Sequence, residues 1–349
     1  MERLDKYSDF FIPPVGLINL SRQSHNNYYE YNYFEDNYNS KLYNVCYMNS
    51  CIQCLFHLKY FANFLLENNG KSLSKASFNL LLKMIKSENG NKTDFNLSVI
   101  EIKEAMSKID QRYKKNNQED VNEFISIYLY ELLEETADKS CQIKKLIIDN
   151  KYEKEAYDKL YCKFYLKNGY SFLMDLFYGI LKIEKYCKYC NNLIFIRFNI
   201  YNMIELPIYE LSKNDLYKSL NLKDIIDNYL QPYKNINSLC NICKREIYTR
   251  TKIYTYPKYL ILYFGRTVEY EYISNDINYD HLLTIDNITF YNLASVIYYT
   301  SFGYKIGHYS CSCKIDNKWY YFDDNNVQKI QKPENISGKV IILFYEKIK

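Results

Sequence analysis

The stretch YNVCYMNS at residues 43–50 decides how the rest of the chain is interpreted, because it places a cysteine where a helix is expected to start. Apolar residues recur at steps of three and four from Cys46 onward, which predicts one helix that ends at residues 68–70, with Asn44 as its N-cap. A thiol in the first helical turn lies at the positive end of the helix dipole, which favours the nucleophilic thiolate. The chain has eleven cysteines, however, and a cysteine taken alone is more often a small buried apolar residue.

Composition limits the class of protein before any residue is assigned a role. The 349 residues are 48% hydrophobic and 25% charged, which is ordinary for a globular protein with one large core or two small ones. The net charge of +4 comes from mixed charges without a basic block, so we do not expect nucleic acid as a partner. The N-terminus lacks the apolar core of a signal peptide, and no run approaches the ~20 apolar residues of a membrane span. We expect a monomer of the cytosol or nucleus that does not bind membranes.

Periodicity predicts an α+β fold, with helices early in the chain and strands late. A second amphipathic helix is predicted at about residues 118–135. Past residue 240 the period changes to two, in the runs KYLILYF, LASVIYY, HYSCSCKI, WYYF and KVIILFY, which are typical of strands. The only low-complexity segment is rich in Asn and Tyr, at about residues 21–43.

A nucleophilic cysteine needs a base, and the chain offers four histidines: His25, His57, His281 and His308. His57 lies about 16 Å along the predicted helix from Cys46, and His25 lies in the low-complexity segment. Of the remaining two, His308 begins a strand whose hairpin partner ends in Asp323, so the carboxylate could orient the imidazole. A surface hairpin with a solvated histidine and aspartate is the alternative.

Two Cys-x-x-Cys pairs form a second group, made of Cys187, Cys190, Cys240 and Cys243. Four thiolates in two close pairs provide a closed tetrahedral set, which predicts one structural zinc ion per chain. The other cysteines apart from Cys46 are interpreted as core or strand residues: Cys51, Cys54, Cys141, Cys162, Cys311 and Cys313.

Several motifs resemble those of the ubiquitin-specific proteases. YNVCYMNSCIQCL resembles the family's cysteine box, and GLINL at residues 16–20 resembles the leading half of that box. QEDVNEF at residues 118–124 is similar to the Gln-Gln-Asp-x-x-Glu-Phe motif. GHYSCSCK, WYYFDDNNV and KVIILFYEK are similar to the histidine box, and YPKYLILYFGR resembles the strand that links fingers to palm. The resemblance extends over residues 16–345.

This resemblance implies a papain-like cysteine protease that hydrolyses the isopeptide or peptide bond after the C-terminal glycine of ubiquitin. A helical thumb at about residues 16–165, zinc-ribbon fingers at about 175–255 and a β-rich palm at about 256–349 are implied, after an N-terminal extension at residues 1–15. Cys46 corresponds to the nucleophile, His308 to the base and Asp323 to the residue that orients the base. Asp120 and Glu123 are expected beside the channel for the arginine-containing tail of ubiquitin, with a solvated helix N-terminus as the alternative. Tyr309 is expected to narrow that channel.

The oxyanion donor is the least direct assignment. The family's amide stands five residues before the nucleophile, where this chain has Lys41. Asn19 in GLINL matches the motif and can serve only if residues 21–42 form a closed loop, whose entropic cost grows only logarithmically with length. Asn39 and Asn44 are the alternative donors.

The sequence departs from the family pattern at four positions: Tyr43 and Val45 beside the cysteine box, and Tyr299 and Ser301 before the histidine box. Two other functions remain open at this point. One is a catalytically weak ubiquitin-binding module, which the complete triad disfavours. The other is a protease for a ubiquitin-like modifier.

Overall fold

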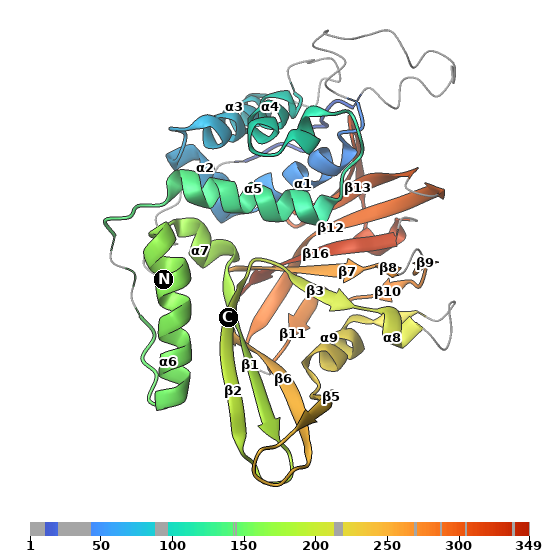
Figure 1. The fold of residues 1–349 in the computed structure, drawn as a ribbon. Coiled ribbons are helices and arrows are strands. Elements are labelled where there is room, and N and C mark those ends of the chain that lie inside the picture. Colours follow the sequence, from blue (N-terminus) through green and yellow to red (C-terminus); the bar gives the residue numbers. More distant parts are fainter. Residues whose placement is uncertain are drawn as a thin grey trace. The chain divides into compact units, whose positions relative to one another are not determined.

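The computed structural model describes residues 11–19, 43–87, 97–141, 143, 145–212, 219–268, 271–286, 288–303, 306–336 and 339–348 (Figure 1). Most of the predicted N-terminal extension and almost all of the insertion at residues 21–43 lie outside these ranges. The chain divides into two compact units, one of Met1–Thr136 and Leu293–Tyr345 and one of Ala137–Asn292 and Glu346–Lys349. The described residues mix helices and strands as the sequence predicts, while the division into thumb, fingers and palm stays a prediction.

The first unit begins with helices packed through their apolar faces. They are α1 Cys46–Phe56, α2 Lys59–Glu67, α3 Ser72–Lys86, α4 Ile100–Ile109, the short 3-10 helix η4 Gln111–Lys114 and α5 Val121–Thr136. The single helix predicted from Cys46 to residues 68–70 was wrong, because Leu58 has an extended backbone and separates α1 from α2. Its side chain is buried, so the apolar pattern continues through the break.

The predicted N-cap at Asn44 was also wrong. Asn44 has a φ of 55°, a left-handed conformation that asparagine tolerates, and its side-chain Nδ2 donates to the Asn116 carbonyl oxygen at 2.8 Å. Val45 is the N-cap residue instead and supplies no side-chain hydrogen bond. The amide of Asn44 therefore fixes the chain before α1 rather than closing the helix end.

Strands cover one side of this unit in the order β15-β14-β13-β12-β16. Their bounds are β12 Phe290–Gly303, β13 Ile306–Ile315, β14 Lys318–Asp323, β15 Asn326–Ile330 and β16 Lys339–Lys347, with the 3-10 helix η6 Pro333–Asn335 before β16. The four strand predictions that fall here are confirmed. Helix α1 packs against β13 and β14. Cys46, the first residue of α1, is therefore on the helix that contacts these two strands.

The turn after β14 brings a distant segment to the strand ends. Asp324 has a φ of 53°, and Asp323 pairs with Asn326, so a two-residue turn joins β14 to β15. A Cβ on Gly16 would lie 2.5 Å from the backbone of Asn325, so only glycine permits this approach. The Leu17 N–H then donates to the Asp324 carbonyl oxygen at 3.0 Å, which holds residues 16–19 against the turn.

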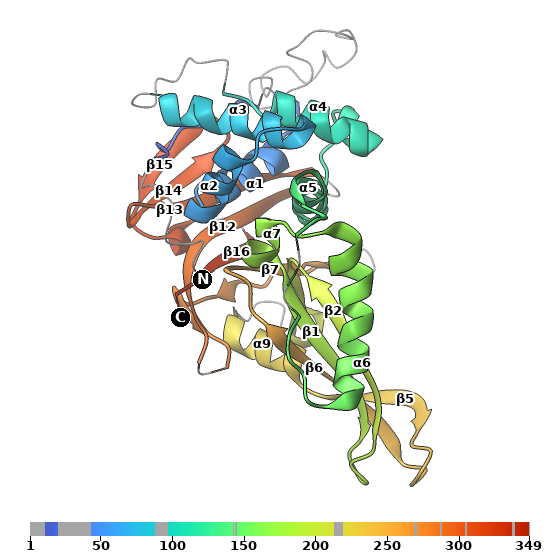
Figure 2. The same ribbon diagram turned by 90° about the vertical axis from the view of Figure 1, so that its left-hand side faces the viewer.

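The second unit is built on a four-stranded antiparallel sheet in the order β2-β1-β6-β5. Its strands are β1 Gly179–Cys187, β2 Leu193–Tyr201, β5 Tyr233–Leu239 and β6 Glu246–Thr255. Helix α6 Lys151–Leu160 packs on β2 through a cluster that contains Tyr157, Tyr161 and Phe198, and Figure 2 shows it beside the long strands. The π-helix η5 Tyr161–Leu166 continues α6, and α7 Phe172–Phe177 follows.

Shorter elements complete the second unit. They are β3 Ile204–Pro207, α8 Tyr209–Ser212, β4 Leu220–Asn221, α9 Leu222–Leu230, β7 Tyr259–Gly265, β8 Thr267–Val268, β9 Glu271–Tyr272, β10 Ile277–Asn278 and β11 Leu282–Thr284. The predicted strand KYLILYF is confirmed as β7, which pairs in parallel with β3. Across the described ranges, we find no helix with the length and apolar character to span a membrane.

Candidate active site

Cys46 is the first residue of α1 and is 3% exposed. Its Sγ accepts a hydrogen bond of 3.2 Å from the Nε2 of Gln118, in the segment just before α5. The same Nε2 donates to the Gly307 carbonyl oxygen at 2.8 Å. The amide is therefore held between the sulfur and the strand that carries His308.

His308 on β13 and Asp323 at the end of β14 form a close pair. The His308 Nε2 lies 2.6 Å from the Asp323 Oδ1, where the ring N–H donates to the carboxylate. Burial lowers the pKa of His308, but hydrogen bonds to Asp323 and Cys46 and the negative charges of Cys46 and Asp324 outweigh it and raise this pKa to about 10. The imidazole is therefore protonated at neutral pH, and Nδ1 is the ring nitrogen left for the Cys46 sulfur.

A second carboxylate lies behind this pair. Asp324 is 4% exposed, and its Oδ2 lies 3.8 Å from the His308 Nε2. Asn49 Nδ2 donates to Oδ1 at 2.8 Å, and Asn19 Nδ2 donates to Oδ2 at 3.0 Å. Burial nevertheless raises the pKa of Asp324. The two amides compensate part of the cost of keeping this carboxylate out of water.

The predicted acidic pair before and in α5 already makes contacts within the protein. Asp120 is exposed and accepts a hydrogen bond from the Asn122 N–H through its side chain. Glu123 forms an ion pair with Arg112, whose guanidinium also pairs with Asp110 at 2.8 Å. A basic ligand would therefore have to compete with Arg112 for Glu123.

Tyr309 packs against a residue that departs from the family pattern. It is mostly buried on β13, and its ring centroid lies 4.8 Å from that of Tyr299 on β12. A Cβ on Gly307 would lie 2.2 Å from the Tyr299 ring, so the glycine before His308 leaves room for this tyrosine. Tyr299, Tyr309 and Gly307 therefore pack together on β12 and β13, next to His308 in the sequence.

The sequence interpretation did not assign roles to Gln118, Asn49 or Asp324. Gln118 opens the QEDVNEF motif, and Asp324 is the second aspartate of WYYFDD. Asn49 follows Cys46 by three residues, which on a helix puts both side chains on the same side. These positions were visible as motif residues, but their hydrogen-bond partners were not.

The four cysteines of the two Cys-x-x-Cys pairs come together in the second unit. Their Sγ atoms all lie within 4.8 Å of one another, with 3.3 Å between Cys187 and Cys243 and 3.6 Å between Cys190 and Cys240. Tetrahedral zinc with Zn–S bonds of about 2.3 Å separates its sulfurs by about 3.8 Å. Asn191 and Lys244, which follow the two pairs, both have a positive φ, so the pairs adopt matching turns. The set could hold a metal ion.

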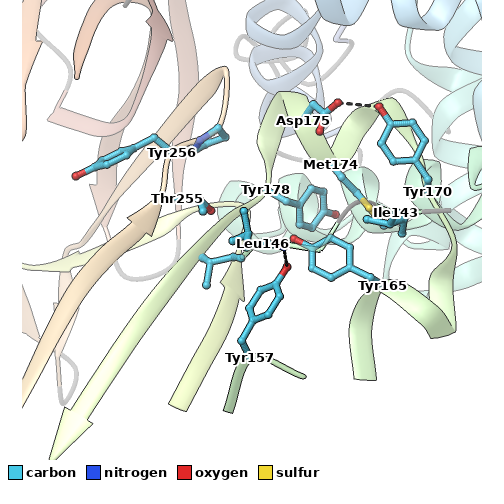
Figure 3. Close-up of a pocket in the computed structure, with 12 residues that line it drawn as sticks. Ile143, Leu146, Tyr157, Tyr165, Tyr170, Met174, Asp175, Tyr178, Thr255 and Tyr256 are labelled. Atoms are coloured by element: carbon cyan, nitrogen blue, oxygen red, sulfur yellow. Dashed lines mark hydrogen bonds between the residues drawn. The ribbon is translucent and has the colours of Figure 1, made fainter. Parts of the chain in front are cut away.

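A separate cavity of about 260 Å³ lies within the second unit (Figure 3). Its wall is rich in tyrosine, and Figure 3 shows the side chains of Tyr157, Tyr165, Tyr170 and Tyr178 that contribute to it. The Tyr170 hydroxyl donates to the Asp175 carboxylate at 2.7 Å, and the Leu146 N–H donates to the Tyr157 hydroxyl at 3.5 Å. These contacts use the hydroxyls of Tyr157 and Tyr170.

Comparison with known proteins places this geometry in a family. A model of the ubiquitin carboxyl-terminal hydrolases matches residues 39–345, which include Cys46, Gln118, His308 and Asp323. The chain belongs to the ubiquitin carboxyl-terminal hydrolase family. This assignment agrees with the resemblance of its motifs to the ubiquitin-specific proteases.

Two similar members of the hydrolase family come from animals. The chain is 27% identical to ubiquitin carboxyl-terminal hydrolase Usp2 of Drosophila melanogaster over 324 residues, 86% of this chain and 34% of that protein. It is 24% identical to ubiquitin carboxyl-terminal hydrolase 2 of Homo sapiens over 334 residues, 86% of this chain and 53% of that protein. The chain thus spans about a third to a half of these relatives.

Solved structures share the hydrolase fold. The SAGA DUB module bound to monoubiquitin matches with a TM-score of 0.69 and 18% identity, covering 100% of this chain and 73% of that chain. The same module bound to ubiquitin aldehyde matches with a TM-score of 0.67 and 19% identity, covering 96% and 70%. At this identity the match establishes the fold.

Proposed function

We propose that this chain is a cysteine-dependent deubiquitinase that cleaves the isopeptide or peptide bond after the C-terminal glycine of ubiquitin. The observation that carries the proposal is the arrangement around Cys46, where a buried thiol at a helix start faces the Gln118 amide and the His308–Asp323 pair. Membership of the hydrolase family supports the same reaction.

In this mechanism, Cys46 attacks as a thiolate next to the protonated His308. Because the pKa of His308 is raised, its ring stays protonated until the intermediate collapses. His308 can then donate the proton that the leaving amine needs. Asp323 holds the ring through Nε2, so that Nδ1 faces the sulfur. After the amine leaves, the neutral His308 can activate a water molecule to hydrolyse the thioester.

The oxyanion requires donors that are already in place before the reaction. We propose that the Cys46 backbone N–H and the Gln118 amide supply them, because that amide already donates to the sulfur and is fixed by the Gly307 carbonyl. Asn19 remains the donor that the resemblance suggests. Its hydrogen bond to Asp324 supports a positioning role instead, since it ties residues 16–19 to the turn after β14.

Substrate recognition is proposed to use the tail of ubiquitin, with a papain-like thumb and palm around it. Asp120 and Glu123 would bind its arginines, and Tyr309 would restrict the channel to glycine. The side chain of Asp120 is exposed, whereas Glu123 would exchange Arg112 for the substrate's cation.

We further propose that Cys187, Cys190, Cys240 and Cys243 bind one structural zinc ion in a zinc-ribbon fingers region. Backbone N–H groups of Tyr189 and Cys190 hydrogen bond to the Cys187 sulfur, and those of Ile242 and Cys243 to the Cys240 sulfur. These bonds favour thiolates, the form that binds zinc. The ion would clamp the ends of two hairpins.

The test is hydrolysis of ubiquitin that carries a fluorogenic amide at its C-terminus, with wild type, His308→Ala and His281→Ala. Only His308→Ala should lose activity, since His281 is not part of the site. Wild-type activity on a ubiquitin-like modifier but not on ubiquitin would show that the substrate is the modifier. Full activity of His308→Ala would overturn the mechanism.

A further inference from the structure

Three cysteines that the sequence presents as inert come together inside the first unit. Cys54 lies on α1, and Cys311 and Cys313 lie two residues apart on β13, so that the two strand thiols point to the same face. All three Sγ atoms lie within 4.8 Å of one another, and all three side chains are completely buried. This grouping results from the packing of α1 on β13.

An imidazole borders this cluster. His57 follows Cys54 by three residues and is the C-cap of α1, so both lie on one side of the helix. Its Nδ1 lies 2.8 Å from the Gln53 carbonyl oxygen. A carbonyl oxygen can only accept, so Nδ1 carries the proton and Nε2 presents a lone pair. The Gln53 carbonyl thereby selects the tautomer that can bind a metal through Nε2.

The Nε2 of His57 is in an unusual position for a structural histidine. The atom is buried and makes no hydrogen bond of normal geometry with any described residue. The ring lies close enough to Cys313 to interact with its thiol. Without a metal ion, the S–H of Cys313 is a weak donor to this nitrogen, and a bound cation would be the stronger partner for its lone pair.

We propose that Cys54, His57, Cys311 and Cys313 form a second metal site, which binds Zn²⁺ in a Cys₃His set. Three sulfurs and one imidazole nitrogen are a recognised structural zinc set, and thiolate ligands select such soft or borderline ions. On binding, three S–H protons leave to solvent, four ligand–zinc bonds form, and the site carries a net charge of −1. Closure brings the sulfurs to about 3.8 Å apart and Nε2 to about 2.1 Å from the ion.

This metal site would join the helix that begins at Cys46 to the strand that carries His308. Cys54 is on the helix that starts at Cys46, and Cys311 and Cys313 are on the strand that contains His308. A metal bound to both elements would fix the helix against the strand from inside the core. The site itself does not depend on the deubiquitinase proposal, because metal content is measured without substrate.

The experiment counts cobalt bound per chain, because Co²⁺ replaces zinc and its thiolate charge-transfer absorption reports sulfur ligation. The reduced 349-residue chain is refolded with excess Co²⁺, desalted and compared with two double variants, Cys311→Val/Cys313→Val and Cys141→Ala/Cys162→Ala. The first pair retains apolar volume in the core. The second removes two exposed cysteines as the matched control.

We expect wild type and the control to bind two equivalents and Cys311→Val/Cys313→Val to bind one, with the fold checked by circular dichroism. The variant His57→Gln, which keeps every thiol, should shift the cobalt d–d bands of the core site without removing the bands of the four-cysteine site. Equal cobalt content in wild type and Cys311→Val/Cys313→Val would overturn the proposal. A wild-type spectrum without imidazole ligation, or a disulfide between Cys54 and Cys311 in freshly purified protein, would also overturn it.

Discussion

Replacing Gln118 with alanine tests which side chain stabilises the oxyanion. Its Nε2 lies 3.2 Å from the Cys46 Sγ and 2.8 Å from the Gly307 carbonyl oxygen, so one donor is anchored and the other faces the reacting sulfur. In the intermediate, the negatively charged oxygen is bonded to the carbon that this sulfur attacks. That oxygen therefore lies within reach of the same N–H. Loss of one such donor costs about 10²–10³ in kcat, or about 2.7–4 kcal/mol of transition-state stabilisation. We expect Gln118→Ala to lose kcat by this factor with little change in KM, because the interaction strengthens only in the transition state.

The assay is steady-state hydrolysis of a fluorogenic ubiquitin amide under reducing conditions, with thermal unfolding of each variant as a check on the fold. Gln111→Ala makes the same change at an exposed position of η4 and should be silent. Gln118→Glu should be slower than Gln118→Ala, since its carboxylate repels both thiolate and oxyanion. A near-normal kcat for Gln118→Ala would refute the reasoning, and a larger loss in Asn19→Ala would assign the donor to Asn19 instead.

Variants of the ion pairs and of the four-cysteine set give further tests. Asp323→Asn removes a hydrogen bond that helps to raise the pKa of His308 to about 10. In the pH profile of Cys46 alkylation by iodoacetamide, the alkaline limb should therefore move to lower pH. An unmoved alkaline limb would contradict this role of Asp323. Arg112→Ala frees Glu123 and should lower KM for ubiquitin substrates with little loss of stability, since exposed ion pairs contribute little; a raised KM would argue against Glu123 as a substrate ligand. Cys240→Ser should release one metal ion and lower the melting temperature with a smaller effect on kcat, and unchanged metal content would disprove that ligand assignment.

Five strands past residue 240 could be predicted because their alternating pattern depends on neighbouring residues alone. The break between α1 and α2 could not, since Leu58 is apolar and buried in an extended conformation and thus preserves the helical pattern. The role of Asn44 was equally hidden. Its amide reaches Asn116, 72 positions away, and a local capping rule does not include such a partner.

The motifs alone predict Cys46, His308 and Asp323 as a triad, whereas the contacts around these residues could not be predicted from the sequence. Gln118 meets Cys46 across 72 positions and Gly307 across 189, and Asn49 meets Asp324 across 275. No local pattern encodes these distances. The same reason explains why Cys54, Cys311 and Cys313 looked like separate core residues, since only the packing of α1 on β13 brings their sulfurs together.

The most direct test of the central claim is the reaction of the protein with ubiquitin whose C-terminus carries an electrophile, followed by intact mass and peptide mapping. The account predicts one covalent adduct per chain, located on Cys46, and none with Cys46→Ser. It also predicts much slower labelling with His308→Ala, because the imidazolium that stabilises the thiolate is lost. Failure of the wild type to react with ubiquitin, or an adduct that persists in Cys46→Ser, would contradict it.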